Sequence, residues 1–357
     1  MYRKYTPHLL LLVVQLCFSG WHVLSKVVLE RGTNALAFAL VREVVASVLM
    51  YVNVKAQGFE INVHRDDIGR FVFLGFCSFV NVVGCILALM YITSTRFAVM
   101  QPSVPVIAAM ISVVIGMEKL NIYKGLGMMT AVTGAFIVEL GSGGAGAEAS
   151  AAPENTNLFL GTAFTVAQCI CMASLIVFQK PLLAKYSPPV LTFVYYSVGA
   201  LITLITCFFW ATSMPFKISD LYFDGNLVVW SCLFYAAIFA TLFTYNAYSY
   251  VSTIVTPSIV TIYSCAQPAW TSILAFLLYG SVITSPEALG GTLIAIGLAL
   301  SVKGAAVEQQ YDPTTTLVDK KDELNDIESS ENGVLLGTFL NINLGNSSND
   351  RVAKHRE

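Results

Sequence analysis

Charge is what this sequence has least of. Only 12% of its 357 residues are Asp, Glu, Lys or Arg, whereas an average soluble domain has about 25%. Fifteen of these 42 charged residues lie in residues 304–357, so the rest of the chain is poorer still. Because a soluble globule of this size needs charged groups on its surface, the composition excludes soluble domains as the main body of the protein.

Residues that support catalysis or metal binding are also scarce. The sequence has four His and no H-E-x-x-H, G-x-S-x-G, P-loop or Rossmann glycine motif. Its eight Cys all lie in apolar stretches without a C-x-x-C pair, which favours packing roles over disulfides or zinc. The net charge of −2, without a basic block, argues against nucleic acid as a partner. We therefore expect no enzyme, no catalytic residue, no cofactor and no metal site.

Apolar residues, by contrast, are abundant, at 56% of the chain. A membrane helix needs about 20 mostly apolar residues. Ten such stretches can be drawn, and they predict an all-α integral membrane protein embedded in a lipid bilayer. They are His8–Leu29, Leu36–Val54, Gly69–Tyr91, Phe97–Met117, Ile122–Leu140, Leu158–Gln179, Pro189–Thr212, Leu227–Ser249, Thr253–Tyr279 and Pro286–Val302. The first lacks a following A-x-A-like cleavage site, so we interpret it as a retained helix rather than a signal peptide.

Lys and Arg in the short loops predict the orientation, because cytoplasmic loops have an excess of both. With the N-terminus inside, the inner segments hold eight of these residues and the outer loops hold Arg31, Arg96 and Lys217. Both termini are therefore expected in the cytosol. The Gly/Ala-rich loop 141–157 would face the other side, and the polar segment 304–357 is predicted to be a disordered cytosolic tail.

An internal repeat divides the predicted helices into two sets of five. One block of matches is displaced by 163 positions and a second by 154. Because five is odd, the halves must insert in opposite orientations, which is an inverted-topology repeat with the substrate site near mid-membrane. We expect five-helix repeats at 8–140 and 158–303. The matched residues are Pro105, Gly127 and Gly134 with Pro268, Gly290 and Gly297, and Lys26, Arg42 and Ala46 with Lys180, Tyr196 and Ala200.

These residues resemble a known family. Each half is similar to the EamA-type module of the drug/metabolite transporter superfamily, and the chain most resembles the plant walls-are-thin-related, nodulin-like group. The segments on which the resemblance rests are 93–98, 101–105, 117–120, 127–134, 177–181 with Tyr186, and 267–268. The resemblance implies a transporter of amino acids or indole-type auxins, in the plasma membrane or a vacuolar-type membrane. Two positions depart from the family pattern, with Ser281 where an acid equivalent to Glu118 is expected and Val82 where Asn is common.

The proline-bearing spans four and nine provide the first candidate binding residues. Proline lacks an N–H and frees a carbonyl about one turn earlier, near Gln101 in span four. A free carbonyl beside a side-chain amide makes a neutral polar patch that can hold a carboxylate or an ammonium group. We therefore predict substrate contacts from Gln101, Gln267 and Ser264, with Pro105 and Pro268 as helix breakers and Thr271 lining the cavity. The alternative is a kink that serves packing alone.

Other predicted site residues lie on spans one, two, three and seven. Arg42 lies about two turns inside span two, where an arginine is costly unless paired. It is predicted either to bind a substrate carboxylate or to hold a gate, and the neighbouring Glu43 needs a partner on another helix. Tyr196, at the equivalent position in the second half, and Asn81 in span three complete the predicted binding set. Gln15, Ser19 and His22 share one face of span one and are predicted to line the cavity.

Three alternatives remain open from the sequence. Substrates with several negative charges, such as nucleotide sugars or phosphate esters, would favour several buried cations, and Arg42 is the one basic residue predicted well inside a span. A non-transporting receptor or scaffold is the alternative of another class. Small residues every fourth position, beginning at Gly127 and Gly291, predict close helix packing or a homodimer face.

Overall fold

The computed structural model describes residues 2–30, 33–91, 97, 100–119, 121–141, 158–210, 218–279 and 285–311. These residues form helices and contain no strand. The α-helices are α1 (Tyr2–Glu30), α2 (Ala35–Ala56), α3 (Ile68–Tyr91), α5 (Ser103–Val114), α6 (Ile122–Gly141), α8 (Leu158–Gln179), α9 (Pro188–Trp210), α10 (Leu227–Ala237), α11 (Thr244–Ile254), α12 (Pro257–Ile262), α13 (Gln267–Tyr279) and α14 (Ser285–Tyr311). Shorter elements are the 3₁₀ helices η1 (Arg65–Asp67), η2 (Leu182–Ala184), η3 (Ile218–Gly225) and η5 (Tyr263–Ala266), and the π-helix η4 (Ile238–Phe243).

Six helical stretches are long and apolar enough to cross a membrane. They are Leu36–Ala56, Arg65–Ala88, Phe159–Ala184, Pro188–Phe209, Leu227–Ile254 and Ala288–Ala306. Shorter apolar helices occupy Thr6–Trp21, Ser103–Val114 and Ile122–Val138. The all-helical, membrane-embedded class is therefore confirmed, whereas the count of ten spans stays a prediction.

Two features of the helices differ from the expectation. Spans eight and nine are interrupted, the first by the π-helix η4 and the second by the 3₁₀ helix η5. The last helix continues to Tyr311, so the first residues assigned to a disordered tail, 304–311, are helical. Most of the predicted loop 141–157, and the tail beyond Tyr311, lie outside the described residues.

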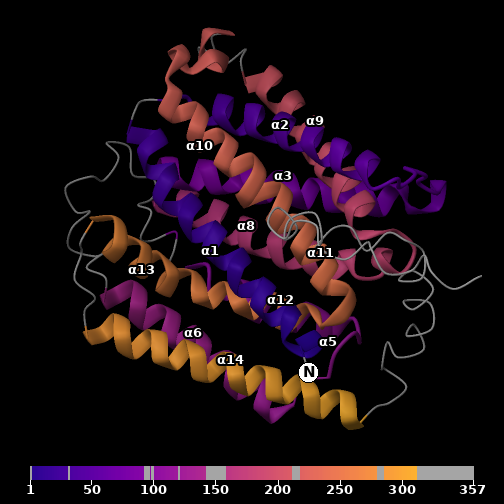
Figure 1. The fold of residues 1–357 in the computed structure, drawn as a ribbon, viewed down its shortest axis with the longest axis vertical. Helices are drawn as coiled ribbons and strands as arrows, with labels where there is room; N and C mark the ends of the chain where they lie inside the picture. The colour runs from indigo at the N-terminus through magenta and orange to yellow at the C-terminus, as the bar shows by residue number, and fades with distance from the viewer. Residues whose placement is uncertain are drawn as a thin grey trace, which may run out of the picture.

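Glycines bring α6 and α14 together along the lower edge of Figure 1. A Cβ added at Gly134 would lie 2.7 Å from the carbonyl oxygen of Gly290, and one at Gly297 would lie 2.6 Å from that of Gly127. No larger side chain fits at these crossings. Ala131 is fully buried in the same contact, so the small-residue face of α6 is covered within the chain.

The helices of the first half pack against those of the second in matching pairs. Helix α1 packs on α13, and its counterpart in the second half, α8, packs on α5. Likewise α3 packs on α8, while α10 and α11 pack on α1. Figure 1 shows α1 running through the middle of the bundle, with α2, α3, α9 and α10 on one side and α6 and α14 on the other.

Candidate functional site

The polar centre of the molecule begins at two breaks in the helical chain, one in each half. In the second half η5 ends at Ala266, and α13 begins with Gln267 and Pro268. In the first half α5 begins at Ser103, so Pro105 lies in its first turn rather than in mid-helix. Proline is tolerated there because the first N–H groups of a helix have no intrahelical partner.

The carbonyls expected to be free at these breaks are occupied. Val104 N donates to the Gln101 carbonyl at 3.0 Å, and Gln267 N donates to the Ser264 carbonyl. Each donor immediately precedes the proline, and each bond is of the tighter i to i+3 type. The prediction of a free carbonyl at Gln101 is therefore wrong, and the amide side chains supply the polar groups instead.

The first polar chain centres on Gln15, in the middle of α1 and fully buried. Its Nε2 donates to the Tyr248 hydroxyl at 2.8 Å, and its Oε1 accepts from Gln267 Nε2 at 2.8 Å. The Gln267 carbonyl accepts from Ser19 Oγ and Thr271 Oγ1, each at 3.0 Å. The predicted residues Gln15, Ser19, Gln267 and Thr271 thus form one connected group.

The second polar chain centres on Gln168, in α8 and buried. Its Oε1 accepts from Gln101 Nε2 at 3.0 Å, and its Nε2 donates to Asn81 Oδ1 at 2.7 Å. Asn81 Nδ2 in turn donates to the Tyr245 hydroxyl at 2.9 Å. The predicted residues Gln101 and Asn81 are therefore joined through a glutamine that the sequence analysis did not select.

Arg42 lies at the end of this second chain. Its side chain is 8% exposed, and its guanidinium lies over the Trp21 ring with 5.2 Å between the guanidinium carbon and the ring centroid. Tyr196 packs edge-on against Tyr245 with ring centroids 5.3 Å apart. Arg42 Nε and the Tyr196 hydroxyl have no hydrogen-bond partner among the described residues. A buried cation and a phenol with unused hydrogen-bonding capacity can accept a carboxylate.

The π-helix sets the orientation of Tyr248 in the first chain and Tyr245 in the second. Thr241 Oγ1 donates to the carbonyl of Ala236, five residues earlier, at 2.7 Å. The extra residue in this turn changes the face that α11 presents, and α11 begins at the next position with Tyr245 and Tyr248 on it. Single π turns inside α-helices occur frequently at functional sites.

The remaining predicted residues are less connected. The Ser264 hydroxyl is buried without a hydrogen-bond partner among the described residues. His22 belongs to α1, but its side chain lies outside the described set. Gln168, Tyr245 and Tyr248 were missed. Gln168 lies one position from the residue that the 154-residue offset pairs with Gln15, so a search that tolerated one residue of slippage would have found it.

A buried ion pair within the first half lies at the end of the bundle where α5 meets α6. Gly116, with φ of 74°, ends α5, and Glu118 then forms a buried salt bridge with Lys124. The other Glu118 oxygen accepts from Ser258 N, in the first turn of α12, at 3.0 Å. Negative charge is favourable at a helix N-terminus. The hydrogen bond from Ser258 N to Glu118 therefore joins the second half to the first.

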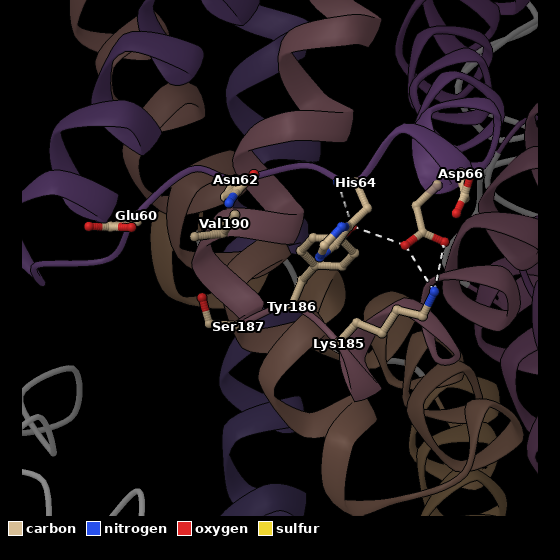
Figure 2. Close-up of a pocket in the computed structure, with 9 residues that line it drawn as sticks. Glu60, Asn62, His64, Asp66, Lys185, Tyr186, Ser187 and Val190 are labelled. Atoms are coloured by element: carbon tan, nitrogen blue, oxygen red, sulfur yellow. Dashed lines mark hydrogen bonds and ion pairs between the residues drawn. The ribbon is translucent and has the colours of Figure 1, made fainter.

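A pocket of about 440 Å³ opens among loop residues before α3 and around η2. Its lining includes Asn62, His64 and Lys185, shown in Figure 2. Asp67, also in the lining, accepts from Lys185 Nζ at 3.0 Å and from the Tyr186 hydroxyl at 3.0 Å. None of the predicted binding residues lines this pocket. Among the described residues, no group of three His, Cys, Asp or Glu could hold a metal ion.

Comparison with known proteins identifies the class. The model of the EamA-like transporter family matches residues 6–140 and again residues 159–303. The chain belongs to this family and is a membrane transporter of small molecules.

Particular relatives are plant proteins. Two WAT1-related proteins of Arabidopsis thaliana are 26% and 29% identical, over 85% of this chain and 85% and 87% of theirs. Protein WALLS ARE THIN 1 of the same plant is 24% identical, over 87% of this chain and 85% of its own. A solved crystal structure matches with a TM-score of 0.64 at 15% identity, over 84% of this chain and 99% of that one.

Proposed function

We propose that the protein transports small organic carboxylates, either amino acids or an auxin-like indole carboxylate, by alternating access between two inverted five-helix repeats. The observation that supports this most is the polar centre. Every side-chain bond between Gln101, Gln168, Asn81 and Tyr245 joins a residue of the first half to one of the second. The bonds of Gln15 to Tyr248 and Gln267 do the same. A site built from both halves can change when the halves rock.

The two hydrogen-bonded polar chains support the internal repeat of five helices as well as the binding site. Gln15, on span one, bonds spans eight and nine. Gln168, on span six, bonds spans three and four. These sets correspond helix for helix under an exchange of the two halves. The two family matches, 6–140 and 159–303, divide the chain at the same place.

The chemistry of the centre favours a substrate with one carboxylate. Amide side chains bind polar groups without adding a buried charge. Arg42 supplies one positive charge. Helices α9, α10 and α11 contain no Lys, Arg or His, and α3 contains only Arg70, near its start. Helix α1, which places Trp21 on Arg42, contains His22 and Lys26 in its second half. A nucleotide sugar, with two or more negative charges, would lack counter-charges here.

Transport by the purified chain in vesicles tests the proposal. Labelled glutamine, indole-3-acetate and UDP-glucose would each be offered to proteoliposomes containing the parent or Arg42→Gln. We expect uptake of glutamine or indole-3-acetate by the parent, and loss of that uptake in the variant. Lys55→Gln, which removes an exposed charge at the end of the same helix, serves as the matched control and should transport normally.

Two results would contradict the proposal. Uptake of UDP-glucose alone would favour the nucleotide-sugar alternative, since that substrate needs a different charge balance. Specific binding without uptake of any compound would favour a receptor. Thermal melting of both variants in detergent separates loss of transport from loss of folding.

A further inference from the structure

Among the described residues, one buried acidic side chain accepts no hydrogen bond. Glu43, about two turns inside α2, is 0% exposed. Both of its carboxyl oxygens lack a hydrogen bond among the described residues. An ionised carboxylate that accepts no hydrogen bond is costly in an apolar interior, and this cost favours the binding of a proton. The buried acids Glu118 and Asp67 differ from it. Lys124 and Ser258 satisfy Glu118, and Lys185 and Tyr186 satisfy Asp67.

The groups facing Glu43 leave few ways to balance a charge. Its own helix contributes Arg42, and α9 contributes the Thr203 hydroxyl, Tyr196 and Cys207. Tyr245 faces it from α11. Cys85, on α3, faces Arg42. Helices α9, α10 and α11 contain no Asp, Glu, Lys, Arg or His.

The Thr203 hydroxyl does not compensate a negative charge on Glu43. Its Oγ1 already donates to the Gly199 carbonyl at 3.2 Å. The phenols are neutral donors with ordinary affinities for protons far above neutral pH. Arg42 is therefore the cation that sets the charge balance at Glu43, and a substrate carboxylate bound by Arg42 would compete for it.

We propose that Glu43 is a proton-binding site that couples each carboxylate carried on Arg42 to the movement of one proton in the same direction. The inference rests on the proposed function. With the site empty, an ionised Glu43 balances the charge of Arg42. When the substrate carboxylate approaches Arg42, Glu43 takes a proton from the water on the entry side, so the site stays neutral. When the substrate leaves on the far side, the proton leaves to the water there.

This charge balance distinguishes two substrates. A monocarboxylate such as indole-3-acetate moves with its proton without net charge. A zwitterion such as glutamine moves with one positive charge. Uptake of indole-3-acetate should thus respond to a pH gradient alone, whereas uptake of glutamine should respond to a pH gradient and to membrane potential. Potassium gradients with valinomycin set the potential, and entrapped pyranine reports the proton flux.

The decisive variant is Glu43→Gln, which keeps the shape and removes the titratable proton. The parent should accumulate its substrate against a gradient when protons flow inward, at one proton per carboxylate. Glu43→Gln should lose accumulation and proton flux and keep equilibrating exchange of labelled substrate. Glu60→Gln, an exposed acid in the loop after α2, is the matched control and should behave as the parent. Substrate-linked proton flux that persists in Glu43→Gln overturns the proposal.

Infrared titration tests the site without substrate. The carbonyl band of a protonated carboxyl should appear as the pH of the purified parent is lowered, and it should be missing in Glu43→Gln. If the parent transports neither compound, the proposed function fails while this titration still tests the proton site. A band that is unchanged in Glu43→Gln overturns it.

Discussion

The two glutamine-centred chains have the same plan and different ends. Gln15 and Gln168 occupy corresponding helices, and each bonds two helices of the opposite half. The first chain ends at Tyr248. The second continues through Tyr245 to Tyr196 and the buried cation Arg42. The repeat therefore fixes where polar groups lie, while single substitutions such as Arg42 against Tyr196 decide which half contributes charge.

The largest expected effect is a loss of stability on removing Glu118, an acid that the second half lacks at the equivalent position. Glu118 occurs in the first half, and Ser281 stands at the equivalent position of the second. Removing one member of a buried ion pair strands the other charge and costs about 3–5 kcal/mol. Glu118→Ala should therefore lower the melting temperature in detergent strongly. An unchanged melting temperature would mean that Lys124 finds another partner.

The next effect tests whether the two chains are equivalent. Gln101→Ala and Gln267→Ala each remove an amide that donates to a central glutamine. Losing one hydrogen bond to a charged substrate group costs about 1.5–3 kcal/mol, which is a roughly ten- to hundredfold loss of apparent affinity. Transport measured against substrate concentration would show this. An effect in only one variant would place the substrate on one chain, and normal affinity in both would mean that these glutamines only pack.

Helix packing offers a comparison in which the halves should behave alike. Gly134 and Gly297 are related by the 163-residue offset, and each meets the backbone of the facing helix. Overpacking typically costs about 1–3 kcal/mol. We therefore expect Gly134→Ala and Gly297→Ala to lower the free energy of unfolding by similar amounts, as measured by denaturant melts. Gly291→Ala, with nothing within 4 Å of its added Cβ, is the control and should be neutral or slightly stabilising. Unequal losses would argue against equivalent packing.

The smallest effect concerns Tyr196. Its hydroxyl is buried and makes no hydrogen bond with the residues that the structure describes, so Tyr196→Phe breaks no bond to them. Stability should change by less than about 0.5 kcal/mol, as measured by thermal melting. A change in apparent substrate affinity in the same variant would assign the phenol to the binding site. A large loss of stability would reveal a structural role for the hydroxyl.

The positions of the helices could be predicted from the sequence because apolar runs are long and their ends have local signals. Span two was expected at Leu36–Val54, and α2 occupies Ala35–Ala56. Asn34 begins it, since its side chain accepts from Leu36 N and Ala37 N. The polar face of span one was likewise apparent from spacing, and Gln15 and Ser19 do share one contact region.

The interruptions of the helices and the hydrogen-bond partners of the polar side chains could not be predicted from the sequence in the same way. An apolar run has the same composition whether it forms an α-, 3₁₀- or π-helix, so η4 and η5 gave no signal in the hydropathy pattern. Partners such as Gln168 for Asn81 depend on how each helix is rotated about its axis. The proline argument failed at Gln101 for a local reason, since a tighter turn closed the carbonyl that an ideal α-helix would leave open.

The π-helix Ile238–Phe243 gives the second half a dependence on chain length rather than on composition. Each residue of an α-helix turns the chain by about 100°, so one residue more or less before α11 rotates everything after it. Deleting one residue within η4 would bring Asn246 and Ser249 to the places of Tyr245 and Tyr248. Their shorter side chains would not span the same gaps to Asn81 and Gln15. Lineages that gained or lost that single residue would therefore differ in the centre of the bundle while keeping almost the same sequence around it.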